Sequence, residues 1–123
     1  MKTMERIPID PAAVLAAQEA ALPEESLLRV VEVFAALADP TRARMLYALL
    51  QGPLCVRDLA IVVGVSESAV SHQLRFLRER RLVQSQRAGT VIYYAMANSH
   101  VAAFFREAGY HVDHVLRGLP DHP

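Results

Sequence analysis

The sequence contains one cysteine, no tryptophan and no long hydrophobic run in its 123 residues. Cys55 has no partner for an internal disulfide, which fits a reducing compartment such as the cytoplasm. No apolar stretch approaches the roughly 18–20 residues that span a bilayer, and the first residues lack the apolar segment of a signal peptide. The chain also lacks a nucleophile spaced with a base and a phosphate-binding glycine loop. We therefore expect neither membrane association nor enzymatic activity.

Net charge is absent as well, because the basic and acidic residues number 13 each. The two signs are nevertheless separated along the chain. Residues 1–39 carry three bases and seven acids, a net charge of −4, and residues 91–123 carry two bases and three acids, a net charge of −1. Residues 40–90 carry eight bases and three acids, a net charge of +5. This middle segment is therefore the part suited to contact phosphates.

Hydrophobic residues make up 53% of the chain, enough for the core of one domain over residues 1–123. Residues 1–22 form an N-terminal arm in this interpretation, with a short helix over 12–21. Apolar periodicity predicts a second helix from Glu24 to about residue 38. A third helix is predicted after Asp39, which can cap it.

The most informative stretch covers residues 54–82 and reads LCVRDLAIVVGVSESAVSHQLRFLRERRL. Its pattern predicts a helix over 54–63, a tight turn at Gly64, and a second helix over 67–80 with Ser66 as its N-cap. This is the layout of a helix-turn-helix, in which the second helix enters DNA. The expected inward positions of the second helix are Ala69, Val70, Leu74 and Leu77.

Residues 83–87 alternate in polarity, Ala88-Gly89 is a turn, and residues 90–94 are β-branched and aromatic, so residues 83–96 predict a β-hairpin. A hairpin directly after a recognition helix is the wing of a winged helix. A last helix is predicted over 98–117, begun by Asn98. The expected fold is therefore mainly α with a small β-hairpin, a winged helix-turn-helix.

The polar side of the second helix predicts a double-stranded DNA partner. Serine and histidine offer small donors and acceptors to base edges, and Arg75 can reach guanine or phosphate. Arg80 and Arg81 continue toward the DNA backbone, and Arg87 lies at the wing tip, where it can enter a minor groove. The candidate DNA contacts are Ser68, Ser71, His72, Gln73, Arg75, Arg78 and Arg87.

Three segments read LADPTRARMLYALL, LCVRDLAIVVGVSESAVSHQLRFLRERRLV and RAGTVIYYAM. They resemble the ArsR/SmtB family of metal-sensing repressors over roughly residues 30–117, and SESAVSHQL is a highly specific string for that family. The resemblance implies a homodimer that binds an inverted-repeat operator without metal and is released when metal binds. It places the DNA contacts on Ser68, Ser71 and His72.

The resemblance also implies a metal motif on the last helix, Asp-x-His followed by His-x-x-His. His100, His111 and His114 match it, whereas Asn98 stands at the Asp position and departs from it. In the nickel/cobalt branch, C-terminal histidines add ligands, a part that His122 could play. The implied effector is Zn, Ni or Co, since imidazole suits all three.

The histidine spacing has a geometric consequence. His100 and His111 are eleven residues apart, a rise of about 16 Å along a helix, so one ion cannot bind both within a chain. They nevertheless share a face with His114. If two such helices pair antiparallel across a two-fold axis, His100 of one meets the other two histidines of its partner.

Cys55 and Asp58 form a rival site. Some relatives bind soft metals with a Cys and an Asp at this spacing, together with cysteines of the N-terminal arm, but this arm has no Cys or His. Three alternatives therefore stay open. The chain could be a winged-helix repressor that senses arsenite, cadmium or thiol chemistry through Cys55, a repressor that responds to no metal, or an interaction module without a DNA role.

Overall fold

The computed structural model describes residues 6–118, and the chain divides into two units between Glu32 and Val33. The first unit holds α1 (Pro11–Ala20) and the greater part of α2 (Glu24–Leu37). Asp10 caps α1 by accepting a hydrogen bond from the Ala13 N–H at 3.0 Å, and every side chain of α1 is exposed. The expectation of one domain over residues 1–123 stays a prediction.

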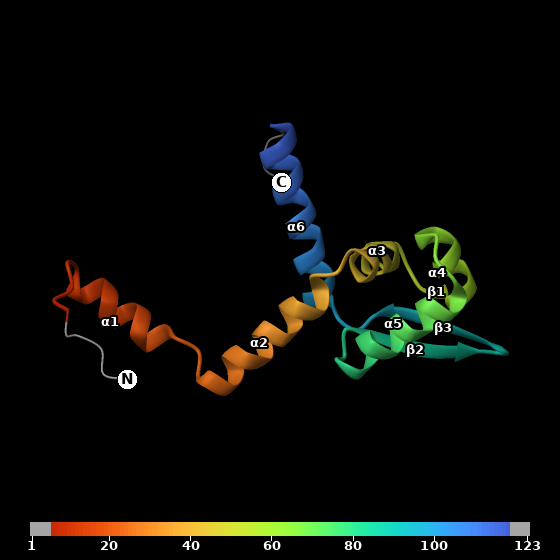
Figure 1. The fold of residues 1–123 in the computed structure, drawn as a ribbon, viewed down its shortest axis with the longest axis horizontal. Coiled ribbons are helices and arrows are strands. Elements are labelled where there is room, and N and C mark those ends of the chain that lie inside the picture. Colours follow the sequence, from red (N-terminus) through yellow and green to blue (C-terminus); the bar gives the residue numbers. More distant parts are fainter. Residues whose placement is uncertain (1–5, 119–123) are drawn as a thin grey trace. The chain divides into compact units, whose positions relative to one another are not determined.

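The second unit holds the last turn of α2 and the helix-turn-helix with its wing (Figure 1). Two antiparallel pairings join its three strands in the order β1-β3-β2, with Gln86 opposite Tyr93 in the hairpin. This arrangement confirms the expected fold class. The elements are α3 (Pro40–Leu49), β1 (Leu54–Cys55), α4 (Val56–Val63), α5 (Glu67–Glu79), β2 (Val83–Ala88), β3 (Val91–Met96) and α6 (Ser99–Arg117).

The start of the helix-turn-helix differs from the prediction. Leu54 and Cys55 were expected to begin a helix, but they form β1 and pair with Tyr94 and Tyr93 of β3. α4 therefore begins at Val56. The partner strand lies about forty residues further along the chain, so local periodicity, which measures helical spacing, carries no signal for it.

The predicted helix caps are confirmed. Asp39 accepts from the Arg42 N–H at 2.9 Å, and Ser66 accepts from the Ala69 N–H at 3.0 Å. Gly64 ends α4 with a φ of +80°, which a residue with a Cβ adopts only with strain.

α5 ends in a tight turn whose left-handed residue is Arg81, with a φ of +60°. The Leu82 N–H donates to the Leu77 carbonyl at 2.9 Å, which closes the helix end in the manner of a Schellman motif. Glycine is the usual residue at that position, and an L-residue there costs on the order of 1 kcal/mol.

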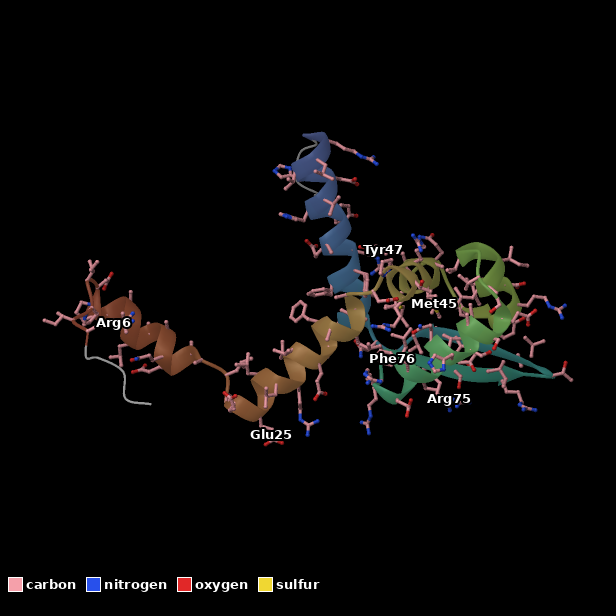
Figure 2. All side chains as sticks on the ribbon, viewed as in Figure 1. Arg6, Glu25, Met45, Tyr47, Arg75 and Phe76 are labelled. Carbon is pink, nitrogen blue, oxygen red and sulfur yellow. The ribbon has the colours of Figure 1, made fainter. Side chains whose placement is uncertain are left out.

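The core lies where α3, α4 and α5 meet (Figure 2 labels Met45). Its largest side chains are at most 2% exposed, and burial of each one contributes about 1.5–3 kcal/mol. Ala69 was predicted to face inward and is exposed, because it precedes Val70 by one residue and consecutive helical residues face different directions. These core side chains are Met45, Leu46, Leu59, Val70, Leu74 and Leu77.

α6 attaches to this core through its first half. Ala102 and Phe105 are buried, and the Tyr47 ring meets the Phe105 ring edge-to-face with centroids 5.0 Å apart. The Tyr47 hydroxyl also donates to the Phe105 carbonyl at 2.9 Å. The described part of the chain holds no helix that is long and apolar enough to cross a membrane.

Candidate nucleic-acid interface and metal site

The outer face of α5 carries the predicted base-reading residues. Ser68, Ser71, His72 and Arg75 are all exposed, and they share one side of the helix through spacings of three and four residues. The opposite side is buried in the core, so the helix has no freedom to turn this row inward. Arg75 is labelled in Figure 2. The structure therefore brings together four of the seven candidate DNA contacts on one surface.

Of the other three candidates, Arg78 continues this side of α5 beyond Arg75, whereas Gln73 and Arg87 lie elsewhere. Gln73 is half-buried, and its Oε1 accepts a hydrogen bond from Nη1 of Arg42 at 3.4 Å, so it faces α3. Arg78 is exposed in the last turn of α5. Arg87 is exposed on β2 opposite Ile92, one residue pair from the end of the hairpin. The two arginines extend the basic surface, whereas the Gln73 side chain contacts Arg42 of α3.

An open groove runs between α5 and the sheet. Ser71, Arg75 and Arg78 line it from the helix, and Tyr94 of β3 lines it from the sheet. Tyr94 was not among the sequence candidates. Its place in the β-branched and aromatic run of the predicted hairpin was the available signal, but only the pairing of β3 with β1 and β2 sets it beside α5.

The three candidate metal-binding histidines are exposed on one continuous helix. His100, His111 and His114 all lie on α6, so the separation of about 16 Å between the first two holds along an unbroken helix. Within residues 6–118, no group of three His, Cys, Asp or Glu side chains in one chain is close enough to hold an ion. His122 lies outside the described residues.

Asn98 starts the last helix, as the sequence predicted. It is the N-cap of α6, and its Oδ1 accepts a hydrogen bond from the Val101 N–H at 3.0 Å. The side-chain oxygen that a metal ion would need therefore already holds the helix start.

The rival pair lies at the start of α4. Cys55 is half-buried on β1, and Asp58 is exposed in the first turn of α4. Both line an open groove with Glu67, whose carboxylate lies 3.7 Å from Nε of Arg57. The structure thus places Cys55 and Asp58 at the same groove.

Comparisons with known proteins agree with this geometry. The model of the bacterial regulatory protein, arsR family, matches residues 39–85. The "Transcriptional repressor SmtB homolog" of Synechocystis is 51% identical over 84 residues, or 68% of this chain and 64% of that protein. The chain thus spans just under two thirds of that relative's length. The "HTH-type transcriptional regulator NmtR" of Mycobacterium tuberculosis is 46% identical over 105 residues, or 85% of this chain and 88% of that protein.

A solved structure has the same fold. It is the homodimeric winged helix-turn-helix DNA-binding domain of a Mycobacterium bovis protein described as a possible ArsR-family transcriptional regulator. The match has a TM-score of 0.73 at 30% identity and covers 85% of this chain and 99% of that domain. The family model covers α3, the helix-turn-helix and the first residues of β2, and the match to NmtR covers 85% of this chain, so the chain belongs to the ArsR family of bacterial regulatory proteins.

Proposed function

We propose that this chain is a metal-responsive transcriptional repressor that acts in the cytoplasm. As a metal-free homodimer it binds an inverted-repeat operator, and it releases the operator when Zn, Ni or Co binds between the two α6 helices. The observation that carries this proposal is the exposed row on α5, which is held outward by a buried core.

The DNA contacts divide by chemistry. Ser68, Ser71 and His72 are short side chains that reach base edges only when α5 lies in the major groove. Arg78 and Arg87 are exposed at the end of α5 and on the wing, where the phosphate backbone would pass. The net charge of +5 on residues 40–90 supplies attraction that does not depend on base sequence.

We propose that α6 packs against a second copy of the chain. Its second half exposes Tyr110, Val112, Val115 and Leu116, and Leu116 is 77% exposed. Large contiguous patches of exposed apolar side chains mark interaction sites in soluble proteins. Pairing of two α6 helices would bury them and set the two α5 helices at a defined separation.

The histidines on α6 fit a metal ion of the proposed kind. Imidazole nitrogen is a ligand for Zn, Ni and Co, and all three side chains are exposed on the helix that would pair. His100 of one copy and His111 with His114 of the other would supply three donors, which leaves the fourth position to Asn98 or another group. When bound, the ion would link the two copies and fix their relative pose.

Operator binding with and without metal tests the proposal. The metal-free protein is used to select its operator from random-sequence duplexes, and affinity is measured by fluorescence anisotropy with Zn(II), Ni(II) and Co(II). We expect one of these ions to weaken binding by roughly 5- to 150-fold, the usual range of allosteric coupling. His111→Ala should bind the operator like the wild type without metal and keep that affinity in metal.

Arg106→Ala is the matched control, because Arg106 is another exposed side chain of α6. It should retain the metal response. If the His111→Ala protein still releases DNA in metal as the wild type does, the site on α6 is wrong.

One observation favours a second candidate. Cys55 and Asp58 line the same groove, which suits a soft ion such as cadmium or arsenite. In that case Cys55→Ser would abolish release from the operator, and the changes at His100, His111 and His114 would leave release intact.

A further inference from the structure

Arg42 in the first turn of α3 reaches two other helices at once. Its Nε donates to the Ala36 carbonyl at 2.6 Å and its Nη2 to the Ala35 carbonyl at 3.5 Å, both in the last turn of α2. Its Nη1 donates to Oε1 of Gln73 on α5 at 3.4 Å. The last carbonyls of a helix have no N–H donor within the helix and carry partial negative charge. A guanidinium group, which is cationic and has several N–H donors, therefore binds them favourably.

The same guanidinium packs on an aromatic ring of α5. Its carbon lies 4.2 Å from the centre of the Phe76 ring, and the guanidinium carbon of Arg80 lies 3.5 Å from that centre (Figure 2 labels Phe76). Arg80 also donates to the Phe76 carbonyl at 3.1 Å. Arg42 therefore holds the second half of α5 through both a hydrogen bond and a stacked ring.

The last turn of α2 in turn contacts α6. The rings of Phe34 and Phe104 meet edge-to-face with centroids 5.3 Å apart. A continuous series of contacts thus runs from α6 to the end of α2, through Arg42, and into α5. Phe34 directly precedes Ala35 and Ala36, whose carbonyls accept hydrogen bonds from Arg42. A shift of α6 against Phe34 would therefore move the backbone to which Arg42 is bonded.

We infer that Arg42 is a positioning residue that transmits the position of α6 to α5, and this inference rests on the proposed function. It fixes the pose in which α5 presents its exposed row, and it carries the metal-dependent change from α6 to that row. The planar fork is essential, because three donors must point at α2 and α5 together, which a lysine ammonium on a flexible stem does not achieve.

The test compares Arg42→Lys and Arg42→Gln with Arg44→Gln, since Arg44 is an exposed arginine of the same helix. Operator affinity, affinity for unrelated duplex DNA and their salt dependence are measured with and without metal. We expect both Arg42 variants to reduce the metal-induced change in operator affinity by roughly 2- to 30-fold, the usual range for residues that couple two sites. Arg44→Gln should leave that change intact.

Salt dependence separates positioning from DNA contact. Loss of one phosphate contact lowers the slope of log affinity against log salt by about one, whereas loss of positioning leaves the slope unchanged. A slope lowered by about one in Arg42→Gln, which removes the positive charge, or a wild-type metal response in both Arg42 variants, would overturn the inference.

Hydrogen exchange keeps the inference testable apart from DNA. Arg42→Lys should speed amide exchange in the second half of α5 and leave α4 unchanged, and Gln73→Met should do the same from the other end of the contact. If the wild type binds no DNA, the proposed function fails. Whether or not DNA binds, equal amide exchange in α5 of the wild type and of Arg42→Lys would refute the positioning role of Arg42.

Discussion

α5 and α6 carry the two proposed activities, and they differ in what holds them. α5 has 13 residues and buries Val70, Leu74 and Leu77 against its own chain. α6 has 19 residues and buries only Ala102 and Phe105, both in its first half. The longer helix is therefore the less supported one within a single chain. The proposed DNA-reading surface is therefore held by packing within one chain, whereas the proposed metal site on α6 requires a second copy.

The proposed functional side chains of α5 and α6 also differ in what surrounds them. The exposed row of α5 stands on a core of aliphatic residues, so its geometry depends on packing within the lobe. The second half of α6, which carries His111 and His114, exposes apolar side chains, so the proposed metal site would depend on association. Protein concentration should therefore affect the two activities differently.

The largest expected effect comes from shortening one leucine in each region. Leu59 is 0% exposed, so Leu59→Ala leaves a cavity and should lower the free energy of unfolding by about 2–5 kcal/mol at any protein concentration. Leu116 is 77% exposed, so Leu116→Ala should change stability only through association. Chemical denaturation at several protein concentrations, with sedimentation to follow the oligomer, measures both.

The contrast would fail if the two changes behaved alike. A loss of several kcal/mol in Leu116→Ala that is independent of protein concentration would mean that α6 packs within its own chain.

A smaller effect is expected at Asn98, where capping and metal binding can be separated. Asn98→Ala removes the oxygen that accepts from the Val101 N–H, and should destabilise the protein by about 1 kcal/mol. Asn98→Asp keeps the cap, because aspartate and asparagine are nearly equal N-caps, and it adds a carboxylate. Thermal unfolding should therefore be unchanged in Asn98→Asp, while competitive titration should show tighter Zn(II) binding. Unaltered Zn(II) affinity in Asn98→Asp would remove position 98 from the ligand set.

The smallest effect is a gain in stability at Gly109 in α6. A Cβ added there would lie 3.7 Å from the Tyr47 hydroxyl, an ordinary contact that needs no rearrangement. Glycine within a helix is less favourable than alanine by about 0.5–1 kcal/mol, so Gly109→Ala should raise the free energy of unfolding by that amount. Urea denaturation measures it. A loss of stability instead would show that α6 moves closer to Tyr47 than the 3.7 Å contact implies.

Local signals in the sequence predicted most of the fold. Capping residues such as Asp39, Ser66 and Gly64 act within a few residues of their own position, and all three were identified correctly. β1 was missed because its partner strand is distant in the chain. Ala69 was assigned to the wrong face because it lies one residue before a true core position.

The candidate site was predicted unevenly for the same reason. The row from Ser68 to Arg75 follows from helical spacing alone and lies as expected. Gln73 belongs to the same helix, but its contact with Arg42 joins residues 31 apart in the chain, so spacing within α5 could not reveal it. Asn98 was read as a doubtful ligand, and its capping bond explains its presence without a metal.

The sequence by itself determined the helices, their caps, the hairpin and the residues that α5 and α6 carry, because helices and caps depend on neighbours within about four positions and the hairpin strands are joined by a short turn. Only the tertiary structure decided that Tyr94 lines the groove beside α5, that Gln73 faces inward, and that Arg42 joins α2 to α5. Those contacts form between segments distant in the chain, and they exist only once burial of the core brings the segments together.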